Sequence, residues 1–140
     1  MPTFVYREEN MEGKQRDTLK TGSIGEKLAV NFLINKGFRI FHTNWRTGHK
    51  ELDIVAGKNG TIHFVEVRSR SRGSIVSPEQ TVNRSKQRMV MAAARIYMTR
   101  YQIRAEARFD VIAIVLGPER TAGSPDYELK YIPDAFTLFL

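Results

Sequence analysis

The chain has 140 residues, a formal net charge of +7 and no cysteine. This length suits one compact domain, and 41% hydrophobic and 26% charged residues are ordinary for a globular protein. Disulfide frameworks, thiolate metal sites and cysteine nucleophiles are excluded. The sequence has no signal-peptide core and no apolar run of the ~18 residues that span a membrane, so we expect a soluble, cytoplasmic protein without a membrane partner.

The positive charge is concentrated in residues 68–104, where nine basic residues face a single acidic one, Glu79. Eight of the nine are arginine, whose planar guanidinium suits phosphate groups. A charge run can be a solvated helix face, but its concentration in one segment favours contact with a phosphate backbone. The nine are Arg68, Arg70, Arg72, Arg84, Lys86, Arg88, Arg95, Arg100 and Arg104.

The first predicted element is a helix that opens a single domain at residues 21–140, after a flexible arm at residues 1–20. Ser23 and Glu26 have capping-box spacing, and Lys36-Gly37 predicts the end of the helix. The residues expected on its buried face are Ile24, Leu28, Phe32 and Leu33.

Three strands are predicted next, separated by two turns. Asn59-Gly60 suits the primed turn of a β-hairpin, and Thr47-Gly48 marks the earlier turn. The predicted strands are Phe38–Trp45, Glu51–Ala56 and Thr61–Arg68.

The second half of the chain predicts a long helix at Asn83–Tyr101 and two further strands, of which the second lies at an edge. The order α-β-β-β-α-β-β predicts an α/β (α+β) fold, with the helices packed on a mixed five-stranded sheet. The residues expected on the buried face of the long helix are Met89, Ala92, Ala93, Ile96 and Tyr97. The remaining segments are a loop at Ser69–Pro78, a strand at Phe109–Leu116, a loop at Gly117–Pro125 and a strand at Tyr127–Ile132.

Acidic residues recur on both strands of the Asn-Gly hairpin. Glu66 and Arg68 follow two apolar residues on one face of the later strand, and Glu51 and Asp53 share a face of the earlier one. Antiparallel pairing brings Asp53 beside Glu66, where two carboxylates repel unless a cation lies between them. Oxygen ligands suit Mg²⁺ or Mn²⁺ rather than zinc, so the pattern indicates metal-dependent phosphodiester hydrolysis.

Simpler explanations exist for these residues. Asp53 and Glu66 could form cross-strand ion pairs with Lys50 or Arg68 on a solvated hairpin, and the capping box alone accounts for Glu26.

The histidines and the tryptophan give weaker signals. His42, His49 and His63 lack metal-ligand spacing and are expected at the surface or in turns, with His49 able to border the carboxylates. Trp45 could stack on a base but is expected in the core.

Six short motifs occur in a fixed order over about residues 22–136. They are Gly25-Glu26, Gly37-Phe38, Asn44-Trp45-Arg46, Glu51–Ala56, Phe64–Arg68 and Arg108–Val111. This series resembles the uncharacterised YraN-like bacterial family, one of the UPF families. The resemblance implies a minimal restriction-endonuclease-like fold, related in pattern to archaeal Holliday-junction resolvases.

The resemblance also implies a D…E-x-K site. In such a site Asp53 and Glu66 bind Mg²⁺ or Mn²⁺, Glu26 adds a further ligand or holds a metal-bound water, and the backbone carbonyl of Val67 completes the set. Arg68 stands where the family has lysine; it stays protonated and cannot be a general base, but it can stabilise the transition state. Lys86 matches a later family lysine and could reach the site. The implied catalytic residues are therefore Glu26, Asp53, Glu66 and Arg68.

The leading hypothesis is a divalent-metal-dependent endonuclease acting on DNA, including structured or branched DNA. The alternatives are a non-catalytic DNA- or RNA-binding module with an impaired site, and a protein whose basic segment binds an acidic partner. A homodimer is plausible because a junction resolvase needs two active sites. The residues expected to contact nucleic acid are Arg46, Arg70, Arg72, Arg84, Lys86 and Arg88.

Overall fold

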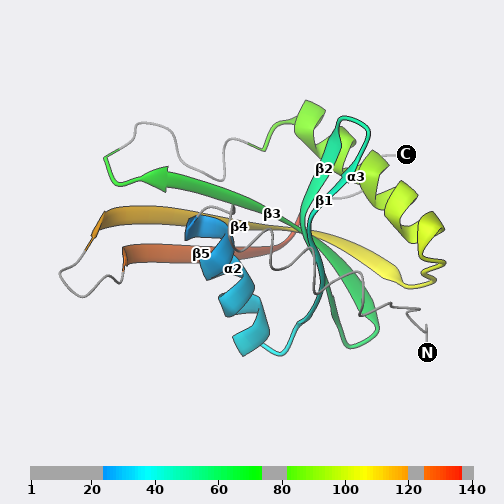
Figure 1. The fold of residues 1–140 in the computed structure, drawn as a ribbon, viewed down its shortest axis with the longest axis horizontal. Helices are drawn as coiled ribbons and strands as arrows, with labels where there is room; N and C mark the ends of the chain where they lie inside the picture. Colours follow the sequence, from blue (N-terminus) through cyan, green and yellow to red (C-terminus); the bar gives the residue numbers. More distant parts are fainter. Residues whose placement is uncertain (1–23, 74–81, 120–124, 137–140) are drawn as a thin grey trace.

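A computed structural model describes residues 24–73, 82–119 and 125–136, and these form two helices and five strands (Figure 1). The predicted order α-β-β-β-α-β-β is confirmed. The arm predicted at residues 1–20 and the capping residue Ser23 lie outside the described residues. The elements are α2 (Ile24–Asn35), β1 (Arg39–Thr47), β2 (Lys50–Lys58), β3 (Thr61–Ser71), α3 (Arg84–Arg100), β4 (Glu106–Glu119) and β5 (Pro125–Phe136).

The strands form one mixed sheet in the order β1-β2-β3-β4-β5. β3 and β4 are parallel, and the other neighbouring pairs are antiparallel. Parallel neighbours need a crossover connection, and the segment with α3 supplies it. β5 is the edge strand that the sequence predicts.

The helices pack on opposite faces of the sheet. On β3, Phe64 belongs to a core with α3, which we call the α3-side core, whereas Val65 belongs to a core with α2, the α2-side core. In Figure 1, α3 and the β1–β2 hairpin lie at one end of the sheet, and the long ends of β3, β4 and β5 lie at the other. Neither described helix is long and apolar enough to cross a membrane.

α2 ends as the sequence predicts. Gly37 has a positive φ of 89°, and the Phe38 N–H donates to the Leu33 carbonyl at 2.9 Å while the Gly37 N–H donates to the Ile34 carbonyl at 3.0 Å. This pattern is a Schellman motif, in which glycine adopts a left-handed conformation at low cost.

The predicted buried face of α2 is partly wrong. Ile24 is 45% exposed, and Leu28 and Phe32 are only partly buried. Small side chains let the helix backbone approach the sheet, so α2 turns a face with Gly25 and Ala29 inward. The buried residues are Gly25, Ala29, Val30 and Leu33.

Both predicted turns of the β1–β2–β3 segment are confirmed. Asn59 and Gly60 have φ of 51° and 77°, and Lys58 pairs with Thr61, as a primed two-residue hairpin requires. Gly48 has a φ of 60° in the turn between β1 and β2.

The predicted buried face of α3 is also rotated. Ile96 is 37% exposed, whereas Tyr97 is buried with its ring 5.1 Å from that of Trp45 and 5.9 Å from that of Phe64, between centroids. The contacts of this large side chain fix the rotation of the helix. The buried residues are Val90, Met91, Ala93, Ala94 and Tyr97.

β3 and β4 are longer than predicted, because their parallel ladder runs without a shift from Thr61–Glu106 to Ser71–Leu116. The loops predicted at 69–78 and 117–125 are correspondingly shorter. Residues 74–81 and 120–124 lie outside the described residues.

Candidate functional site

The candidate site lies where the β2–β3 hairpin opens. The registered pairs run from Lys58–Thr61 to Ile54–Val65, and Asp53 and Glu66 are the next residues on the two strands. The Asp53 carboxylate accepts the Val67 N–H at 2.9 Å. A side chain thus takes the place of a ladder hydrogen bond where the backbones separate, as a buried N–H requires.

Glu66 is a buried carboxylate without a conventional partner. Its side chain continues the β3 face of Phe64 into the α3-side core, and the residue is only 1% exposed. Neither carboxylate oxygen accepts a hydrogen bond from any residue that the structure describes. Two cations lie near Oε2, with Lys86 Nζ at 3.7 Å and Arg68 Nη2 at 3.9 Å, both beyond hydrogen-bond distance.

Burial and then the Asp53 charge raise the pKa of Glu66 to about 8, although Lys86 and Arg68 act to lower it. The protonated form is also favoured because it can donate to Asp53. The predicted approach of Asp53 to Glu66 is therefore present, and the pair holds a proton where a cation would relieve the repulsion.

Glu26 lies in the first turn of α2, and its carboxylate accepts a hydrogen bond from the Asn44 side-chain amide at 2.9 Å. Burial raises the pKa of Glu26, the Asn44 hydrogen bond opposes that rise, and the charges of Asp53 and Glu51 reinforce it. Glu26 therefore shares the electrostatic field of Asp53. Glu51 has its own neighbour, Arg46, at 3.7 Å.

The donors present fit a small divalent cation with oxygen ligands. Glu66 has buried oxygens that no donor occupies, and Asp53 adds a second carboxylate. The N–H and carbonyl of one strand residue point to the same side, so the Val67 carbonyl faces the opening that its N–H crosses to Asp53. Within the described parts of the chain, no three histidine, aspartate or glutamate side chains converge on one metal position. The side-chain ligands available are therefore the pair Asp53 and Glu66.

The predicted nucleic-acid contacts divide into separate groups. Lys86 faces the sheet and Glu66, whereas Arg84 and Arg88 are exposed on α3. At 100° per residue, Arg84, Arg88 and the exposed Arg95 fall within about 40° of one another, and Lys86 lies about half a turn away. We call these three arginines the outer arginine stripe.

The other predicted contacts lie on strands. Arg70 follows Arg68 on the same face of β3, as side chains two apart do. Arg72 reaches across the sheet to Asp126 of β5, with 2.9 Å between the guanidinium and the carboxylate. A side chain at Gly117 of β4 would meet the Arg72 guanidinium at 3.0 Å, so glycine leaves room for this crossing.

The prediction that the histidines lie at the surface or in turns is wrong for two of them. His42 is 2% exposed, with its ring nitrogen 2.6 Å from the Tyr97 hydroxyl. His63 lies 2.7 Å from the carboxylate of Asp110, which is fully buried. His49 lies in the turn as predicted, and Trp45 is a core residue, 1% exposed.

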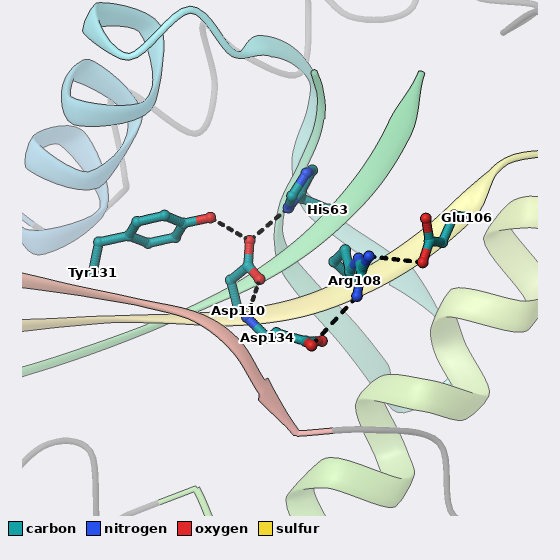
Figure 2. Close-up of polar contacts among 6 residues, drawn as sticks. All are labelled: His63, Glu106, Arg108, Asp110, Tyr131 and Asp134. Atoms are coloured by element: carbon teal, nitrogen blue, oxygen red, sulfur yellow. Dashed lines mark hydrogen bonds and ion pairs between the residues drawn. The ribbon is translucent and has the colours of Figure 1, made fainter. Parts of the chain in front are cut away.

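Asp110 is the centre of a polar network whose partners the sequence did not indicate (Figure 2). Besides its contact with His63, it accepts the Tyr131 hydroxyl at 2.6 Å and the Asp134 N–H at 2.8 Å. Burial alone would raise the pKa of Asp110, but its bonds to His63, Tyr131 and Asp134 outweigh it and lower the pKa. The network is satisfied and ties β3, β4 and β5 together. A charged residue inside a nearly all-apolar strand was the signal for it.

Comparison with known proteins agrees with the motif series. The model of the uncharacterised protein family UPF0102 matches residues 25–114. Similar proteins are UPF0102 proteins of Alkaliphilus oremlandii (39% identical, covering 84% of this chain and 97% of the relative), Bacteroides thetaiotaomicron (37%, 82% and 90%) and Chlorobium chlorochromatii (35%, 85% and 92%). The predicted resemblance to an uncharacterised UPF family is thus confirmed. The chain belongs to the uncharacterised protein family UPF0102.

Proposed function

We propose that this protein is a divalent-metal-dependent endonuclease that hydrolyses phosphodiester bonds of DNA at Asp53 and Glu66. The observation that carries the proposal is Glu66, a buried carboxylate that has no hydrogen-bond donor among the described residues and lies against a second carboxylate. Such an arrangement is costly for folding alone, and strongly perturbed carboxylates are typical of functional sites.

A bound Mg²⁺ or Mn²⁺ would polarise the phosphoryl oxygen and lower the pKa of the attacking water. Hydrolysis forms a bond from the water oxygen to phosphorus and breaks one bridging P–O bond. The water gives up a proton, and the leaving oxygen takes one from solvent. Arg68 stays protonated and cannot accept the proton of the water, so we assign that role to Glu26, a carboxylate whose pKa burial raises.

Two cations flank the carboxylate pair and suit the charge that develops on phosphate. Arg68 and Lys86 both lie within 4 Å of Glu66. Positioned positive groups stabilise the transition state most where water is largely excluded, and Glu66 is such a place.

The outer arginine stripe is proposed to bind the DNA backbone away from the reacting phosphate. Changing Arg84, Arg88 and Arg95 together to glutamine is expected to weaken DNA binding, because counterion release is lost with each phosphate contact. The slope of log affinity against log salt is expected to fall by about 0.9 per contact, or about 2.7 for all three. The measurement is DNA affinity from about 50 to about 200 mM salt.

The matched control for the stripe is Arg108→Gln, because two carboxylates already engage that guanidinium: Glu106 at 2.8 Å and Asp134 at 3.3 Å. This control should keep the wild-type salt slope. An unchanged slope in the triple variant would show that the stripe does not contact phosphate.

The second candidate function is a non-catalytic nucleic-acid-binding module. Arg68 and Lys86 favour it, since two cations beside Glu66 offset part of its charge without a metal. Arginine at position 68 also lacks the proton-transfer capacity of the lysine that the family pattern has there.

Arg68→Lys separates the two functions. If Arg68 limits turnover, the lysine variant should cleave at least about tenfold faster, because general bases contribute 10²–10⁴-fold. The measurement is the Mn²⁺-dependent cleavage rate at saturating DNA. Arg70→Lys, two residues along the same strand, is the control and should leave the rate unchanged. No cleavage by either Arg68 form would favour the binding module.

A further inference from the structure

Asn44 has an unusual backbone conformation inside β1. Its φ is 48°, in the left-handed region, although it lies within a strand between the registered pairs Thr43–Ile54 and Trp45–Leu52. It therefore stands level with Asp53 on the neighbouring strand. Asparagine tolerates this conformation better than most residues, but it still costs free energy that the surrounding structure must supply.

The backbone turn at Asn44 breaks the alternation of side chains along β1. His42 and Trp45 are three residues apart, yet both contact Tyr97 of α3. β2 has a matching break, because Leu52 and Val55, also three apart, both belong to the α3-side core. Regular strands would place such residues on opposite faces. Asn44 and Asp53 thus lie at facing irregularities of neighbouring strands.

The consequence is a contact between β1 and α2. The Asn44 Nδ2 atom donates to Oε2 of Glu26 at 2.9 Å, across 18 residues of sequence and in a partly buried setting. The bond fixes the rotamer of a carboxylate that burial and Asp53 would otherwise disfavour in its charged form. Local strain at Asn44 is therefore spent on the orientation of one acidic side chain.

We propose that Asn44 is a positioning residue, which holds the Glu26 carboxylate toward the Asp53–Glu66 pair so that Glu26 can orient the attacking water. The inference rests on the proposed function. Asn44 itself touches no reacting atom and acts through Glu26.

Asn44→Gly tests the inference, because glycine accepts the positive φ and preserves the backbone while removing the amide. We expect kcat to fall about 10–100-fold, as for partners that orient functional groups, and KM for DNA to stay within about twofold. The melting temperature should not fall. In the metal-free variant, the carboxyl carbon resonance of Glu26 should shift in the NMR spectrum, since it loses its donor.

The matched control is Asn59→Gly, which also replaces an asparagine of positive φ, 51°, but in the β2–β3 turn at the far end of the hairpin. It should change neither kcat nor the Glu26 resonance. In a Glu26→Gln background, Asn44→Gly should have less than its single-variant effect on kcat, because the two residues act as one unit.

The outcomes separate the inference from the function on which it rests. Wild-type cleavage together with unchanged kcat or an unmoved Glu26 resonance in Asn44→Gly would overturn the inference alone. An equal loss of kcat with and without Glu26 would overturn it too. Absence of metal-dependent cleavage by the wild type, with the resonance still shifted, would overturn the proposed function and with it the positioning role.

Discussion

Asp53→Asn is expected to lower the affinity for Mn²⁺ by at least about a hundredfold and to abolish metal-dependent cleavage. The substitution removes one of two carboxylates from the opening of the hairpin, and changing even the outer partners of metal ligands costs 10–100-fold. Asparagine keeps an oxygen that can accept the Val67 N–H, so the hydrogen bond at 2.9 Å and the fold should survive. Calorimetric titration with Mn²⁺ measures the affinity, and thermal unfolding checks the fold.

The control for Asp53→Asn is Glu106→Gln, at the start of β4. That carboxylate is exposed and pairs with Arg108 rather than with any residue of the site. Its variant should bind Mn²⁺ as the wild type does. Equal Mn²⁺ affinity in the wild type and Asp53→Asn would show that Asp53 is not a ligand.

Glu66→Gln is expected to change how stability depends on pH in the metal-free protein. Glu66 titrates near 4.5 in the unfolded chain and at about 8 when folded, because burial and Asp53 disfavour its charge. Between these values the folded state binds one more proton than the unfolded state, so stability is lost as pH rises. The contribution is fully present below pH 4.5 and disappears as pH rises through about 8. The slope approaches about 1.4 kcal/mol per pH unit.

The glutamine variant should lack this loss, because its neutral amide does not titrate and can donate to Asp53. The measurement is urea unfolding of both proteins in a chelator from pH 5 to pH 8.5, expressed as the difference in unfolding free energy. Subtraction removes contributions from groups such as Glu26 and Asp110. A difference that is flat across this range would contradict a raised pKa for Glu66. Saturating Mn²⁺ should restore wild-type stability at pH 8, because metal binds the deprotonated pair.

The hairpin part of the site could be predicted because its determinants are local. Asn59-Gly60 sets the turn, the turn sets the register, and the period of two then places Asp53 and Glu66 on neighbouring strands. The point at which the strands separate could not be predicted. It depends on the facing irregularities at Asn44 and Asp53, and no sequence period marks them.

Contacts between distant segments were the other part that sequence could not supply. Lys86 reaches Glu66 only because the crossover returns α3 over the α3-side core. His63 and Asp110, 47 residues apart, meet because β3 and β4 pair in parallel with Val65 beside Asp110. The faces of both helices were misplaced for a related reason: packing by Gly25, Ala29 and Tyr97, rather than hydrophobicity alone, sets their rotation.

The central claim is that the carboxylate pair supports metal-dependent hydrolysis of DNA. The most direct measurement is cleavage of single-stranded, duplex, flap and junction DNA with Mn²⁺, by the wild type, Asp53→Asn and Glu66→Gln. The account predicts that the wild type cuts at least one of these substrates, that chelation stops it, and that neither variant cuts. Cleavage by Asp53→Asn at the wild-type rate, or no cleavage of any substrate by the wild type, would contradict it.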